Sequence, residues 1–120
     1  MEYSLQTVRD FGKRLRKLRE ERHPDLSMGK LASKAHVAPS YLSKIERGVE
    51  RASEETIVAI ADALGESRDV LLAMDGRVST RLQEIIVKRP ALFAELIEKL
   101  DGMPDHAFVR IVRVVRDGKW

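Results

Sequence analysis

The chain has 120 residues, of which 43% are hydrophobic and 34% charged, with a formal net charge of +3. This composition is typical of a globular protein with one modest core and excludes an intrinsically disordered chain. The absence of cysteine excludes disulfides and thiolate chemistry. No apolar run approaches the ~18 residues that span a bilayer, and the start of the chain lacks a signal-peptide pattern. We therefore expect a cytoplasmic protein without a membrane partner.

The charges are unevenly distributed along the chain. Residues 9–22 hold seven Lys/Arg against three Asp/Glu, residues 27–51 hold five against two, and residues 53–69 hold one against five. A polarised surface of this kind steers a protein onto a polyanion such as DNA. From the charges alone, an ordinary solvated surface is the favoured interpretation.

The first half of the chain predicts three helices. Apolar residues recur at three- and four-residue spacing over residues 5–22, which indicates an amphipathic helix. Ser27 offers an N-cap to a short helix over 28–35. Pro39 fits the first position of a third helix over 39–47, because that position needs no amide donor.

Two more helices are predicted before a turn. Ser53 precedes two glutamates and an apolar run that ends at Gly65, a pattern typical of a capped fourth helix. Ser67 caps a short fifth helix. Asp75 and Gly76 then mark a turn and the expected domain boundary, with a first domain over 1–75 and an extension over 76–120.

The extension predicts three further helices, over 79–88, 90–101 and 105–117. The last segment is rich in β-branched residues, so a strand stays open there as an alternative. The three-residue spacing of Arg110, Arg113 and Arg116 favours helix. The predicted fold class is therefore all-α, with a five-helix domain followed by a short helical tail.

The second and third predicted helices meet the requirements of a helix-turn-helix. The helices cross closely, which needs a small residue, and Ala32 supplies it. The turn needs a residue that tolerates a left-handed backbone, and His36 is suitable. The inward positions of such a motif must be apolar, and those positions are Leu31, Ala35, Val37, Leu42 and Ile45.

The stretch LREERHPDLSMGKLASKAHVAPSYLSKIERG and the later SEETIVAIADALG resemble the phage-repressor-like helix-turn-helix family of XRE or Cro/CI type. The resemblance covers roughly residues 9–74 and rests on several elements in the right order and spacing. It implies a compact bacterial or phage-type DNA-binding domain, usually dimeric, that reads an inverted repeat near a promoter. The sequence departs from the family at Met28, where a glutamine that contacts phosphate is common.

The resemblance also implies roles for individual residues. Arg19 would pair with Glu46 and tie the first helix to the third. Lys44 is the strongest candidate for a guanine contact, because its ammonium donates to the O6 and N7 acceptors. The base-reading positions are Pro39, Ser40, Ser43 and Lys44, and the candidates for contact with the DNA backbone are Ser27, Lys30, Lys34, Tyr41, Arg47 and Arg51. For Tyr41, coverage of the core edge is an equal alternative.

The tail carries apolar sides that its own 45 residues cannot cover. We expect them to pack on the DNA-binding domain, on a second copy of the chain, or on both. The residues predicted for a dimer interface are Phe93, Leu96, Phe108, Ile111, Val112 and Val115. A two-fold dimer would hold two recognition helices about 34–36 Å apart, one turn of DNA.

No catalytic, cofactor or metal site is predicted. The three histidines lack metal-ligand spacing, and the chain contains no GxSxG, HExxH or phosphate-binding loop. The leading hypothesis is a homodimeric, sequence-specific repressor rather than an enzyme. The alternative is an antitoxin-type protein whose tail binds a partner protein while the first domain binds DNA.

Overall fold

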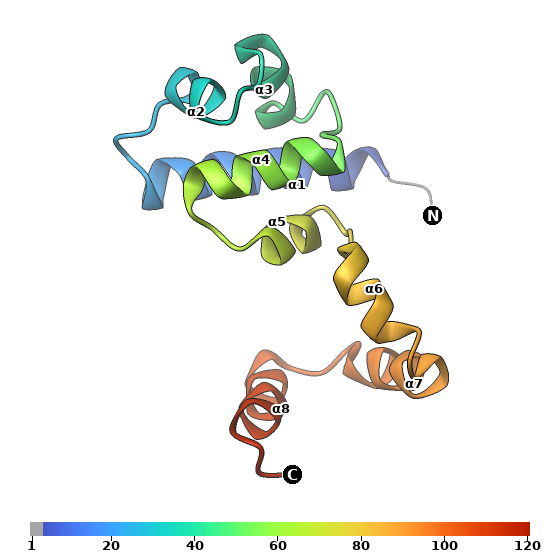
Figure 1. Ribbon diagram of the computed structural model, residues 1–120. Helices are drawn as coiled ribbons and strands as arrows, with labels where there is room; N and C mark the ends of the chain where they lie inside the picture. Colours follow the sequence, from blue (N-terminus) through green and yellow to red (C-terminus); the bar gives the residue numbers. More distant parts are fainter. Residues whose placement is uncertain (1–3) are drawn as a thin grey trace. The chain divides into compact units, whose positions relative to one another are not determined.

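The computed structural model describes residues 4–120, and over that range the chain is helical with no strand (Figure 1). Its eight helices are α1 (Leu5–Arg22), α2 (Met28–Lys34), α3 (Pro39–Glu46), α4 (Glu54–Leu64), α5 (Arg68–Met74), α6 (Thr80–Ile86), α7 (Pro90–Leu100) and α8 (Asp105–Asp117). The all-α prediction is confirmed, and the strand alternative for the last segment is wrong. No helix in this range combines the length and apolarity needed to cross a membrane.

Helices α2, α4 and α5 begin at the N-cap residues that the sequence predicts. The Oγ atoms of Ser27, Ser53 and Ser67 each accept a hydrogen bond from the backbone amide three residues later, as predicted. Ser4 caps α1 in the same way, although no cap was predicted there. These bonds satisfy amides that the first turn of a helix leaves without an intrahelical partner.

Several predicted helices end earlier than expected. Ala35 and Arg47 are C-caps of α2 and α3 rather than helical residues, although their amides still bond back into the helix. The sixth helix is also shorter than predicted, because it occupies Thr80–Ile86 instead of 79–88. Such differences of one or two residues are ordinary for frayed helix ends.

The chain divides into two compact units, a first unit that ends at Ser79 and a second unit of Thr80–Trp120. The division lies a few residues beyond the turn at Asp75 and Gly76. Residues 1–3 of the predicted DNA-binding domain lie outside the described residues. The first unit contains α1 to α5, and the second contains α6 to α8.

The first unit has a closed hydrophobic core to which all five of its helices contribute. The largest side chains in it are at most 2% exposed. They are Phe11, Leu15, Leu31, Leu42, Ile45, Ile57, Ile60, Leu71 and Leu72. The second unit differs, since none of its residues is buried.

A glycine that sequence reasoning overlooked sets the distance between α1 and α3. Gly12 is buried in the middle of α1. A Cβ built on it would collide with the carbonyl oxygen of Ile45 and lie 2.8 Å from that of Glu46. The backbones of the two helices therefore approach closely because this position has no side chain.

This close approach predicts that Gly12→Ala destabilises the first unit. Overpacking costs about 1–3 kcal/mol, which exceeds the gain of up to about 1 kcal/mol in helix propensity. Urea denaturation measures the change. The matched control is Gly29→Ala, because a Cβ on Gly29 meets nothing within 4 Å and its variant should keep or gain stability. Equal effects of the two substitutions would contradict the crossing argument.

Candidate nucleic-acid interface

The turn between α2 and α3 has the backbone geometry that the sequence predicted. Among the described residues, His36 is the one non-glycine with positive φ, at 57°. The amide of Val37 donates to the carbonyl oxygen of Ala32 at 2.9 Å, which closes the turn. Both Ala32 and Ala35 are buried, so the two helices pack without intervening bulk. The left-handed residue lets the chain reverse over a very short distance.

Helix α3 presents one apolar and one polar side. Leu42, Ile45 and Glu46 are buried beneath it. The predicted base-reading residues lie on the other side, where Pro39, Ser40 and Lys44 are exposed and Ser43 is partly exposed. Pro39 begins the helix, and Ala38 provides no side-chain cap. The structure thus brings these four residues onto one solvent-facing side of a single helix.

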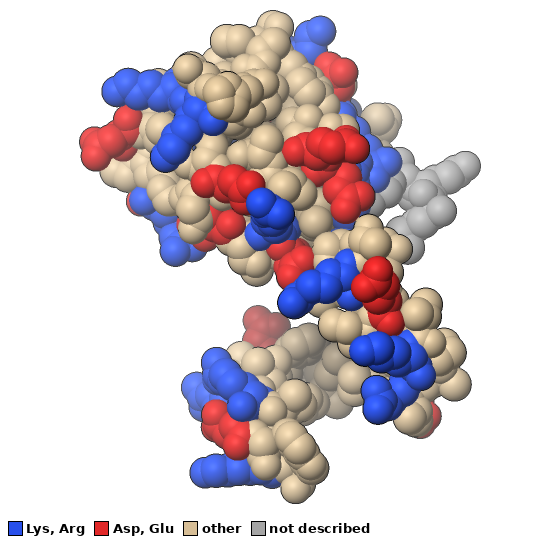
Figure 2. All heavy atoms as spheres, in the orientation of Figure 1, with Lys and Arg blue, Asp and Glu red and all other residues tan. Residues whose placement is uncertain are grey.

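The residues at and near α2 that are predicted to contact the DNA backbone are also exposed. Ser27, Lys30 and Lys34 all face solvent, while the Ser27 Oγ accepts the amide of Lys30 at 3.2 Å. Met28, which stands where the family often has glutamine, instead packs against the core. In Figure 2, Lys and Arg side chains lie beside α2, whereas acidic side chains gather over α4.

Tyr41 has a structural role. It packs against the core and is only partly exposed. Its hydroxyl oxygen accepts a hydrogen bond from the amide of Ser53 at 3.2 Å, which ties α3 to the start of α4. The hydroxyl oxygen thus has a partner within the fold, and contact of Tyr41 with phosphate stays a prediction.

The remaining residues predicted to contact the DNA backbone, Arg47 and Arg51, differ in their surroundings. The Nε of Arg47 donates to Ser43 Oγ at 3.3 Å. The Nε of Arg51 lies 3.6 Å from Asp75 Oδ2, and Arg77 Nε lies 2.9 Å from the same oxygen. Arg51 therefore has an intramolecular partner besides any phosphate.

Sequence reasoning read Asp75 only as a turn residue, yet its side chain is 1% exposed. Burial raises the pKa of this carboxyl, and the charges of Arg77 and Arg51 partly oppose that shift. Arg77 also donates from Nη2 to the carbonyl oxygen of Ala52 at 2.7 Å. This cluster joins the end of the first unit to the segment that follows α3.

Arg19 and Glu46, the pair that the resemblance implies, form a buried bidentate ion pair. Nη2 and Nε of Arg19 lie 2.7 Å and 2.9 Å from the two carboxylate oxygens of Glu46. The side chains are only 11% and 6% exposed. The hydrogen bond to Glu46 raises the pKa of Arg19 against the opposing effect of burial. Two parallel bonds fix orientation as well as distance, so the pair sets how α3 is rotated against α1.

Loss of one member of this pair should be costly. We expect Glu46→Ala to destabilise the first unit by about 3–5 kcal/mol, because it leaves the Arg19 charge buried without its partner. Chemical denaturation measures the loss.

The double variant Arg19→Met/Glu46→Leu is the control for this experiment. It removes both charges and keeps apolar bulk, so its free energy of unfolding should lie much closer to that of the unmodified chain. A double variant as unstable as Glu46→Ala would show that lost packing, rather than an unpaired charge, explains the effect.

Comparison with known proteins agrees with this geometry. A family model described as a helix-turn-helix domain matches residues 10–74, which is more than half of the chain. A search of curated proteins found no match. The matched region begins in α1 and ends with α5, so it contains the turn at His36 and the whole of α3. The chain belongs to the helix-turn-helix domain family, whose members bind DNA.

Proposed function

We propose that this chain is a sequence-specific transcription regulator of the phage-repressor-like (XRE or Cro/CI) type. In this proposal α3 lies in the major groove of double-stranded DNA. The observation that carries it is the exposed polar side of α3. This helix follows the left-handed turn at His36 and is fixed to α1 by the buried Arg19–Glu46 pair. With eight residues, α3 is about 12 Å long, comparable to the width of the groove.

The exposed residues of α3 have the chemistry needed to read bases. The ammonium of Lys44 donates to the O6 and N7 acceptors of guanine. The hydroxyls of Ser40 and Ser43 donate or accept and therefore discriminate less. Pro39 has no donor and suits apolar contact with a thymine methyl. Lys30, Lys34 and Arg47 neutralise phosphates and orient the helix without specifying sequence.

The second unit supports a homodimer. None of its residues is buried, and a unit of this size does not cover three amphipathic helices with its own chain. Leu96, Phe108, Val112 and Val115 are between 42% and 63% exposed, while Phe93 and Ile111 are partly exposed. A second copy would cover this apolar surface and supply a second α3 for an inverted repeat. Such a dimer on a promoter represses by excluding polymerase.

The same exposed surface fits a second candidate, an antitoxin-type protein whose tail binds a different protein. The two candidates share the DNA contact and differ in what covers α7 and α8. A monomeric chain in solution that dimerises neither alone nor on DNA would favour the second candidate.

Selection of bound sequences from random DNA tests the proposed function. An enriched inverted repeat with half-sites about one turn apart is the expected result. Weak binding with a steep dependence on salt and no enriched sequence would mean phosphate contacts without base readout, and would overturn the proposal.

Lys44→Ala should weaken binding to the selected site by about 1–3 kcal/mol and relax the preference at one base pair. The matched control is Lys17→Ala, since Lys17 is an exposed lysine of α1 and its loss changes net charge equally. Binding and selection are repeated for both variants. If the two variants lose equal affinity and keep the same preference, Lys44 does not read a base.

The dimer is tested with paired substitutions on α8. Val112→Gln/Val115→Gln removes apolar surface and should raise the dimer dissociation constant about tenfold or more, because each buried valine contributes roughly 1–2 kcal/mol. Arg110→Gln/Arg113→Gln is the control on another side of the same helix. Sedimentation across a concentration series measures both. An intact dimer in the valine variant would place the interface elsewhere.

A further inference from the structure

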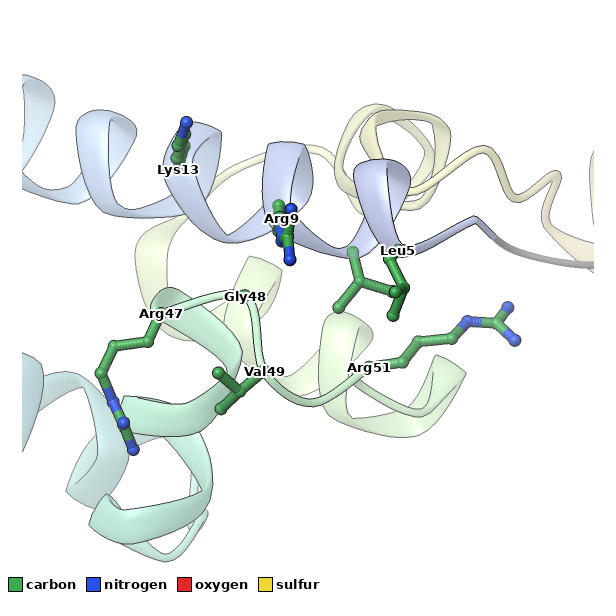
Figure 3. A pocket seen from close by; sticks show the side chains of 8 residues that line it. Leu5, Arg9, Lys13, Arg47, Gly48, Val49 and Arg51 are labelled. Atoms are coloured by element: carbon green, nitrogen blue, oxygen red, sulfur yellow. The ribbon is translucent and has the colours of Figure 1, made fainter.

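A groove of about 490 Å³ lies between the first turns of α1 and the segment that follows α3 (Figure 3). Its apolar part includes Leu5 and Val49, whose side chains are 74% and 64% exposed. Its polar part consists of basic side chains from two places in the chain. Arg9 and Lys13 project from α1, while Arg47 and Arg51 point to opposite sides of the segment after α3.

The two basic side chains of α1 that line the groove, Arg9 and Lys13, have no acidic partner within the described residues. Within residues 4–120, no Asp or Glu lines the groove, and neither Arg9 nor Lys13 takes part in an ion pair. The nearest acids in sequence are Asp10, which accepts a hydrogen bond from Gln6 Nε2 at 2.9 Å, and the exposed Glu50. The groove thus places two basic side chains of α1 beside an apolar wall.

The two walls of the groove are in direct contact. Gly48 has φ of 73°, and a Cβ on it would lie 2.7 Å from the Cα of Arg9 and 3.1 Å from its Cγ. On the same segment, the amide of Val49 donates to the carbonyl oxygen of Lys44 at 3.0 Å. The position of Arg9 is therefore set relative to the end of α3.

We propose that this groove binds a phosphodiester group of the DNA backbone, with Arg9 and Lys13 as the phosphate contacts. The inference rests on the proposed function. A helix seated in the major groove is flanked by backbone phosphates, and this groove lies directly beside the C-terminal end of α3. A deoxyribose-phosphate unit has an anionic and an apolar part, which match the basic side chains and the wall of Leu5 and Val49. The contact adds affinity and orientation without reading sequence.

The test compares two variants of equal charge. Arg9→Gln/Lys13→Gln removes both proposed contacts, and glutamine keeps the Cβ and Cγ atoms that pack on Gly48. Arg14→Gln/Lys17→Gln removes two exposed charges of the same helix that do not line the groove. The dissociation constant of each variant is measured on the selected site and on random duplex between 50 and 200 mM salt, with thermal unfolding as the control for folding.

The groove variant should bind both duplexes at least about tenfold more weakly at low salt. The slope of log K against log salt should fall by about 1–2, the number of phosphate contacts removed. Its base preference should be unchanged, and the control variant should stay within about threefold of the unmodified chain. Equal behaviour of the two variants, or an altered base preference in the groove variant, would overturn the inference.

Two further results separate this inference from other outcomes. If the unmodified chain selects a sequence and Lys44→Ala relaxes it while the groove variant matches its control, the inference fails and the proposed function stands. If the unmodified chain binds no DNA, both fail. In a last comparison, the unmodified chain is titrated with inorganic pyrophosphate, and binding is followed by the NMR chemical shift of the Gly48 amide. Saturation below 1 mM together with unimpaired DNA binding by the groove variant would assign the groove to a small phosphorylated molecule instead.

Discussion

The contact between α1 and α3 is the constraint on which the rest of the first unit depends. An isolated helix of eight residues is not stable in water, so α3 takes its form and direction from what it packs against. Gly12 permits the close approach of the two backbones, and the bidentate pair of Arg19 and Glu46 fixes the rotation. Because Glu46, Leu42 and Ile45 face inward, the intervening polar residues have to face solvent.

The segment after α3 is held from two sides, which explains how a loop can keep a defined geometry. At one end Gly48 lies against the backbone of Arg9. At the other end the carbonyl oxygen of Ala52 accepts a hydrogen bond from Arg77, whose charge is balanced by the buried Asp75. Buried charges of this kind add little net stability. Their effect here is positional, because they join the end of α5 to the chain that leaves α3.

The features predictable from the sequence are those written in local patterns. Helix periodicity, the caps at Ser27 and Ser53 and the left-handed turn at His36 each depend on a few neighbouring residues. Gly12 and Asp75 were overlooked because their roles depend on partners far along the chain, and a lone glycine in a helix looks only like a weak helix former. Tyr41 stayed ambiguous for the same reason, since the amide of Ser53 that it binds lies twelve residues away. The resemblance, not the spacing, pointed to Arg19 with Glu46.

The two units differ in how they obtain stability, and this difference bears on how the protein would act. The first unit closes its own core, so its fold does not require a partner. The second unit has amphipathic helices and no buried residue, so a second copy that covers its apolar sides would stabilise it, and the effect would grow with protein concentration. If the second unit joins two chains, each DNA contact made by one α3 raises the effective concentration of the other at the neighbouring half-site. Modest affinity per half-site then suffices, and occupancy of an inverted repeat becomes a steep function of the amount of protein present.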